Sequence, residues 1–233
     1  MAQSMVLSRV ELDVRPFRGA SQEYITHQLI ADLFGDRDDR GYLYRVMRES
    51  RDRRVVTALV LSHDPPRDVT PYRPWGSIRR VERKPFAPVI QPGTLLDYEI
   101  RLNATTVVTE PSGRKRRTDI WDAVFAADRG DRRSPHEVYV AYMQRKLEGI
   151  AEIVDGRITA RGQVRARRPD TRHPITFIAA NLIGTLRVID PAAFITTVGA
   201  GIGRSKSFGC GLLCLSRPGS VLPRRHIGAA EPV

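Results

Sequence analysis

Tyr24 and His27 lie three positions apart in a segment, residues 21 to 34, that has the pattern of a helix. At 3.6 residues per turn, three positions bring two side chains to within about 60° of each other around the axis. Both would then project away from the apolar face made by Ile25, Leu29 and Leu33. A phenol beside an imidazole can orient a hydroxyl and transfer protons near neutral pH. The same spacing also fits two ordinary surface residues, so by itself it leaves both interpretations open.

A glycine-rich segment near the C-terminus, residues 199 to 215, carries a second group of candidate residues. Its sequence is GAGIGRSKSFGCGLLCL. Glycine adopts positive φ and lets backbone approach a ligand closely, and successive exposed N–H groups in such a loop bind anions. We therefore expect phosphate binding by residues of this loop, namely Gly201, Gly203, Arg204, Ser205, Lys206 and Ser207. A plain glycine-rich turn before a strand is the alternative. The spacing matches neither the P-loop nor the dinucleotide-binding pattern, and no helix follows.

A third group of candidates is the basic stretch that begins at Arg161. In a strand, Arg161, Arg165 and Arg167 share one face, while the small and apolar residues between them take the other. Two more arginines, Arg168 and Arg172, extend this face around the following turn. A basic hairpin of this kind is suited to follow the phosphates of an A-form RNA stem. The alternative is a solvated edge strand whose charges prevent aggregation.

The net charge of the chain indicates a polyanionic partner. The 233 residues include 38 basic and 26 acidic side chains, which give a formal net charge of +12. Only four of the basic residues are lysine, and arginine is the better bidentate ligand for phosphate. Such an excess of positive charge is typical of nucleic-acid binding. Codon usage in a GC-rich genome would explain the ratio of arginine to lysine, but not the net charge.

At this point the sequence resembles a known family. The segment G-I-G-x-x-K-x-F-G-C-G-L-L is similar to the C-terminal signature of the CRISPR-associated repeat endoribonucleases, and specifically of the CasE type found in Cascade complexes. Weaker similarities occur in the expected order, namely VLSRVELDV, Y-x-x-H, RLNAT and QRKLEG. Together these segments span about residues 5 to 216. The glycine signature is the specific one.

The resemblance implies a function and a pair of catalytic residues, His27 and Tyr24. In this family the 2′-hydroxyl of the RNA attacks the adjacent phosphorus, leaving a 2′,3′-cyclic phosphate and a 5′-hydroxyl. The cut would fall at the 3′ base of the CRISPR repeat stem-loop, and the enzyme would remain with its product as a Cascade subunit. No metal or cofactor is expected, and the other histidines (His63, His136, His173 and His226) are scattered. The residues do not assign which group is the acid and which the base.

Two other functions remain open on the sequence. The first is a non-catalytic RNA-binding protein of the same fold, which would share every basic feature described above. The second is a metabolic enzyme that binds a phosphate in the glycine-rich loop. The net charge and the missing nucleotide motifs argue against this second alternative.

The order of predicted elements indicates an α+β protein of two tandem ferredoxin-like (RRM-like) domains. The first, residues 1–103, reads as strand, helix, two strands, an irregular proline-rich passage with one short strand, and a final strand. The second, residues 104–217, begins with a hairpin and a helix. It continues with strands at residues 156–167 and 176–188, a short helix, the glycine-rich loop and a last strand. Residues 218–233 are expected to be a disordered tail.

The composition also bears on the cellular location. No apolar run approaches 18 residues, so no transmembrane helix and no membrane partner are expected. The N-terminus lacks the layout of a signal peptide because Arg9 and Glu11 interrupt it. Two cysteines in 233 residues suit a reducing compartment. We therefore expect a cytoplasmic protein.

Overall fold

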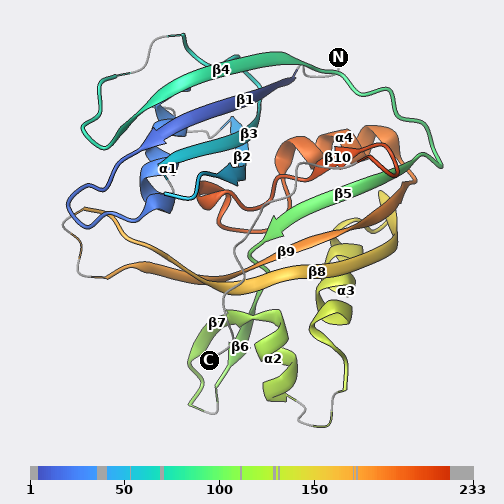
Figure 1. Ribbon diagram of the computed structural model, residues 1–233. Helices are drawn as coiled ribbons and strands as arrows, with labels where there is room; N and C mark the ends of the chain where they lie inside the picture. The colour runs from blue at the N-terminus through green and yellow to red at the C-terminus, as the bar shows by residue number, and fades with distance from the viewer. Residues whose placement is uncertain are drawn as a thin grey trace.

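The chain forms two antiparallel four-stranded sheets, seen one above the other in the computed structural model in Figure 1. The structure describes residues 5–35, 41–52, 54–68, 71–110, 112–127, 130, 132–169, 171 and 173–220. None of the described helices is long and apolar enough to cross a bilayer. We call the sheet nearer the N-terminus sheet A and the other sheet B.

Sheet A is covered on one face by the first helix. Its elements are β1 (Met5–Val14), α1 (Gln22–Asp32), β2 (Tyr42–Glu49), β3 (Val55–Ser62) and β4 (Gly76–Phe86). The strand order is β2-β3-β1-β4, and all neighbours are antiparallel. Alternation along β1 brings Val10 and Leu12 into one core with Leu29 and Ile30 of α1. The described residues between β3 and β4 contain several prolines and no helix, as the sequence indicated.

Sheet B repeats the same strand order with different connections. Its elements are β5 (Leu95–Leu102), α3 (Pro135–Lys146), β8 (Ala151–Ala166), β9 (Ile175–Val188), α4 (Pro191–Ala200) and β10 (Cys214–Ser216). The order is β10-β5-β9-β8, so the first strand again lies between the third and fourth. The two ferredoxin-like units predicted from the sequence are therefore present.

The boundary between the two units differs from the one predicted at residues 103 and 104. Strand β5 pairs with β9 and β10, so it opens the second unit rather than closing the first. The sequence predicted only a short strand in the proline-rich passage. The observed strand, β4, is longer and already supplies the fourth strand of sheet A. The segment from 105 to 127 is an insertion between β5 and α3. It contains β6 (Thr105–Thr109), β7 (Lys115–Asp119) and α2 (Ile120–Ala127), which project from the body in Figure 1.

The end of the chain also differs from expectation. The last strand is only three residues long, and Cys210 precedes it in the loop. Both thiols are buried, which raises the pKa of Cys210 and of Cys214 to about 11. The predicted tail begins as an ordered turn, in which the Gly219 N–H donates to Asp97 at 2.9 Å. Residues 221–233 of that tail lie outside the described residues.

The larger core lies between the sheets and joins the two units. Helix α4 contributes Phe194 and Val198, which pack in one cluster with residues from both sheets. A buried ion pair also crosses this interface, since Arg45 on β2 donates to Glu99 on β5. A different arrangement of the sheets would separate the two charges and leave each buried without its partner. The pair therefore favours the observed arrangement of the sheets.

Candidate active site

The N-terminus of α1 is attached to the end of strand β8 in the other unit. The Ser21 hydroxyl caps the helix by accepting from the Tyr24 N–H at 3.3 Å. The same oxygen accepts from the Arg167 N–H at 3.1 Å, and the Ser21 N–H donates to the Arg167 carbonyl at 3.0 Å. These bonds place the predicted basic strand directly beside the helix that carries Tyr24 and His27. Ser21 and Arg167 are 146 positions apart, so no local pattern in the sequence indicates that they pair.

The side chain of His27 extends from α1 toward the glycine-rich loop. Its ring centroid is 6.0 Å from that of Phe208, and Phe208 in turn lies 5.7 Å from Phe177 on β9. The Nδ1 atom of His27 is shielded from solvent, although the residue as a whole is partly exposed, as is Tyr24. The imidazole therefore sits at a junction of three elements rather than on an open helix face. Phe208 belongs to the glycine-rich segment, but the sequence did not indicate that it contacts His27.

The glycine-rich loop is fixed by contacts with both sheets. Gly201 ends α4 with φ 73°, and the Ile202 N–H donates to the Gly211 carbonyl at 2.9 Å. The buried Tyr44 hydroxyl donates to the Ser207 carbonyl at 2.8 Å. Short turn η1 (Lys206–Phe208) then contacts α1. The loop is thus held in one conformation beside the helix with His27.

The polar side chains of this loop have different surroundings. Asn103, which is buried, donates to the Ser205 hydroxyl, and Ser205 itself has a left-handed backbone with φ 56°. The Lys206 ammonium donates to the Ala200 carbonyl at 2.6 Å, so it closes the loop and lines a pocket of about 400 Å³ beside β2. Arg204 is exposed. Of the two basic residues predicted to bind phosphate here, only Arg204 faces solvent freely.

The predicted alternation of the basic strand is observed in its second half. Val164 and Ala166 are buried, whereas Arg165 and Arg167 are exposed. Neither of these arginines forms an ion pair with any residue that the structure describes. Arg168 is exposed in the turn that follows, and Arg172 lies outside the described residues.

Arg161 has a partner that the sequence did not reveal. Its guanidinium donates to Asp119 and to Asp122, each at 2.7 Å, and its side chain is only 26% exposed. Asp119 also accepts from the hydroxyl of Tyr139, and burial together with this carboxylate raises the Tyr139 pKa. Because Asp119 lies 42 positions away, in the inserted segment, strand periodicity could not show this cluster. Arg161 therefore anchors the insertion to β8.

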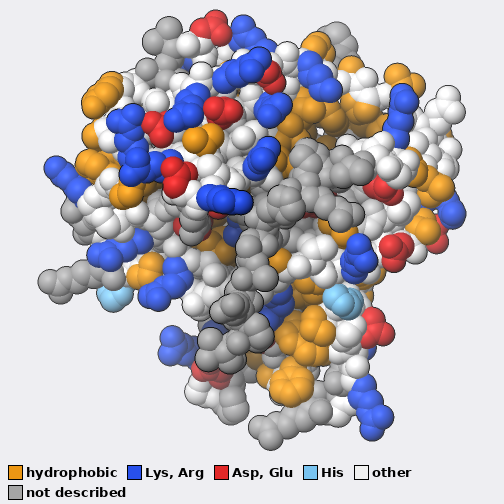
Figure 2. Space-filling view, viewed as in Figure 1, with side chains coloured by type: hydrophobic (Ala, Val, Ile, Leu, Met, Phe, Trp, Pro, Cys, Tyr) orange, Lys and Arg blue, Asp and Glu red, His pale blue; other side chains and the backbone are white. Residues whose placement is uncertain are grey.

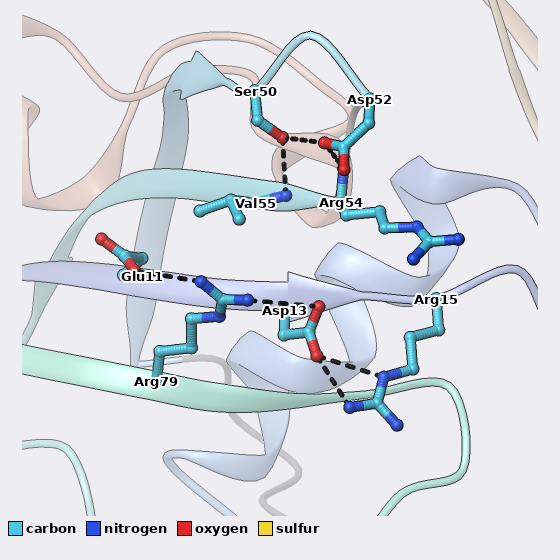
Figure 3. A network of polar contacts seen from close by, with 8 residues as sticks. All are labelled: Glu11, Asp13, Arg15, Ser50, Asp52, Arg54, Val55 and Arg79. Carbon is cyan, nitrogen blue, oxygen red and sulfur yellow. Dashed lines mark hydrogen bonds and ion pairs between the residues drawn. The ribbon is translucent and has the colours of Figure 1, made fainter.

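The exposed part of sheet A that lies opposite α1 carries many basic side chains, most of which are paired with carboxylates. Over this sheet, in the upper part of Figure 2, blue side chains are interspersed with red ones. Figure 3 shows the pattern in detail, with Arg79 lying 3.9 Å from Glu11 and 3.8 Å from Asp13. Arg15 also contacts Asp13, at 2.9 Å. The arginines at the end of β8 differ from these because no such acidic partners accompany them among the described residues.

Comparisons with known proteins agree with this architecture. The fold is similar to the crystal structure of the CRISPR-associated protein Cas6e from Escherichia coli str. K-12, with a TM-score of 0.63 and 19% identity over 90% of this chain and 99% of that one. It is similar to the CRISPR endoribonuclease Cse3 bound to a 19-nucleotide RNA, with a TM-score of 0.67 and 21% identity over 91% and 99% of the two chains. A chain of a CRISPR RNA-guided surveillance complex in a pre-nicking state gives a TM-score of 0.63 and 22% identity, over 91% and 99%.

These identities are low, so they establish similarity of fold. A search of curated proteins finds no match. The sequence itself, however, matches the model of the family described as CRISPR associated protein over residues 5–217 of its 233 residues. Because this match includes both sheets, the helix with His27 and the glycine-rich loop, the chain belongs to the CRISPR-associated protein family.

Proposed function

We propose that this chain is an endoribonuclease that processes precursor CRISPR RNA at the 3′ base of the repeat stem-loop. The observation that supports it best is the meeting of three groups at one place. Ser21 joins the helix of Tyr24 and His27 to the exposed arginines of β8, and Phe208 joins the same helix to the glycine-rich loop. A phosphate held by the arginines and the loop would therefore lie near an imidazole and a phenol.

The proposed chemistry needs only the RNA's own 2′-hydroxyl and proton transfers. His27 transfers a proton during attack of that hydroxyl on phosphorus or during departure of the 5′-oxygen. Tyr24 orients the hydroxyl. Arg204 and backbone N–H groups of the loop stabilise the charge that develops on the phosphorane oxygens. The products are a 2′,3′-cyclic phosphate and a 5′-hydroxyl, and no cofactor takes part.

The proposed partners are the repeat stem-loop and the other subunits of a Cascade-type effector. The +12 charge and the exposed arginines suit an RNA stem. Similar folds have been solved as an endoribonuclease bound to RNA and as part of an RNA-guided surveillance complex. We infer from this that the enzyme keeps its product after cleavage and enters the effector complex with it.

The direct test is cleavage of a repeat stem-loop RNA in excess EDTA, with analysis of the product ends. We expect an undiminished rate, since proton transfer by side chains requires no divalent ion. The upstream product should carry a 2′,3′-cyclic phosphate and the downstream product a 5′-hydroxyl. Binding without any cleavage would favour a non-catalytic RNA-binding protein, and a 3′-hydroxyl product would exclude attack by the 2′-oxygen.

Changing Arg165 and Arg167 together to alanine should weaken stem-loop binding and its dependence on salt. Each lost phosphate contact lowers the log–log slope of affinity against salt by about 0.9, so the slope should fall by about 2. Arg187→Ala, at the opposite end of the β8–β9 pair and bound to Glu152, is the matched control and should leave the slope unchanged. An unaltered slope in the double variant would mean that the face is only solvated.

The predicted RNA contact by Arg161 is tested separately because this side chain already has two carboxylate partners. Arg161→Ala leaves the buried Asp119 carboxylate short of a donor, which costs about 1–3 kcal/mol of folding free energy. Chemical denaturation measures that cost. A change in the salt slope of binding, in addition, would assign Arg161 to the RNA-contacting set.

A further inference from the structure

The turn that precedes α1 contains an arginine in an unfavourable backbone conformation. The Ala20 N–H donates to the Phe17 carbonyl at 2.7 Å, and the two central residues, Arg18 and Gly19, have φ of 44° and 68°. Positive φ at both central positions defines a type I′ turn, whose first position favours Asn, Asp or Gly. Among the described residues, only Arg18 and Ser205 are non-glycine residues with positive φ. Both lie at the candidate active site, where a strained conformation often accompanies function.

The side chain of Arg18 is held over an aromatic ring. Its guanidinium carbon lies 5.1 Å from the centroid of Phe17, and Phe17 packs against Trp75 with ring centroids 5.0 Å apart. On the Trp75 side, Arg73 lies 5.5 Å from the indole and is fixed by two hydrogen bonds to Asp32, at 2.8 and 2.7 Å. The inner part of this cluster is therefore rigid, while Arg18 is exposed and has no acidic partner among the described residues.

The position of Arg18 relates it to the proposed RNA path. The neighbouring Gly19 packs against the Arg167 side chain, since a Cβ built on Gly19 would lie 3.7 Å from the guanidinium carbon of Arg167. From Ser21 to His27 the helix advances only about 9 Å, at 1.5 Å per residue. The Arg18 side chain would thus contact RNA bound by Arg167, at a point close to the scissile phosphate.

We propose that Arg18, supported by Phe17, is a binding site for the base of an unpaired nucleotide next to the stem. This inference rests on the proposed function. A guanidinium plane stacks on a base whenever that base is not paired, and unpaired bases at the ends of stems are the ones available to proteins. The exposed plane fixed on an aromatic ring is pre-organised for this contact. The unfavourable turn conformation is tolerated because it aims the side chain.

The test separates the base contact from a general effect of charge. Arg18→Asn introduces a residue that the type I′ turn favours at this position, so the melting temperature should stay the same or rise. Arg18→Lys keeps the charge but lacks the plane. Binding is measured with four RNAs, namely the bare stem-loop and stem-loops carrying unpaired nucleotides on the 5′ side, the 3′ side or both. Arg187→Ala serves as the control for loss of a positive charge.

We expect Arg18→Asn to weaken binding of at least one extended RNA by about tenfold, in line with the loss of one stacked base, and to leave the bare stem-loop unaffected. Arg18→Lys should behave like Arg18→Asn. The inference is overturned if Arg18→Asn binds every extended RNA as tightly as the wild type, if all four RNAs lose affinity equally, or if Arg18→Lys retains full affinity. Failure of the wild type to bind any stem-loop would instead reject the proposed function, and with it this site.

Discussion

His27→Ala is expected to cleave the repeat stem-loop at least about 10²-fold more slowly than the wild type, which is the usual loss for a general acid or base. Binding should persist, because the arginines of β8 and the glycine-rich loop supply the phosphate contacts. His27 is partly exposed and contacts Phe208, so its truncation should cost no more than about 1 kcal/mol of stability. Single-turnover cleavage at saturating enzyme, together with binding and melting, gives all three quantities.

Two further variants make the result for His27 specific. Tyr24→Phe removes one hydroxyl and keeps the ring, so its cleavage rate should fall less than that of His27→Ala. His136→Ala removes an imidazole from α3, where Nδ1 accepts from the Ile158 N–H at 3.1 Å, and it should cleave normally. A wild-type rate for His27→Ala would refute the catalytic assignment. Joint loss of binding and cleavage would make His27 a contact residue instead.

A single deoxyribose at the nucleotide before the cut should abolish cleavage altogether. The proposed nucleophile is the 2′-oxygen of that nucleotide, so its removal leaves nothing to attack the phosphorus. The modified RNA should bind with nearly unchanged affinity, since the phosphates and the stem remain. Single-turnover assays with the modified RNA and with an RNA carrying deoxyribose two nucleotides upstream provide the comparison. Cleavage of the first RNA at the ordinary site would show that water or another group is the nucleophile.

Local pattern was sufficient to predict most of the fold. The predicted order of helices and strands agrees with β1, α1, α3, β8 and β9, and the glycine-rich segment was correctly expected to be a loop before a strand. What the sequence could not give were pairings between distant segments. The assignment of β5 to sheet B depends on hydrogen bonds to β9, about 85 positions away, which no local pattern encodes.

The same limit applied to the candidate site. Strand periodicity placed Arg161 on the same face as Arg165 and Arg167. Only the tertiary structure reveals that the Arg161 guanidinium is paired with two carboxylates. Helical spacing put Tyr24 beside His27, but the contact of His27 with Phe208 joins residues 181 positions apart. Composition predicted a polyanionic partner. The positive φ of Arg18 could not be predicted, because non-glycine residues other than Asn and Asp rarely adopt it.

The hydrogen bonds between Ser21 and Arg167 restrict which halves of two related proteins can be combined by recombination. The helix with the proposed catalytic pair comes from the first unit, while the strand that fixes its start comes from the second. A chimaera that combined the first unit of one homologue with the second unit of another would have to preserve this backbone register as well as the Arg45–Glu99 pair. Each half therefore constrains the other, and we expect the exchange of one unit alone to disrupt these contacts despite the repeated topology.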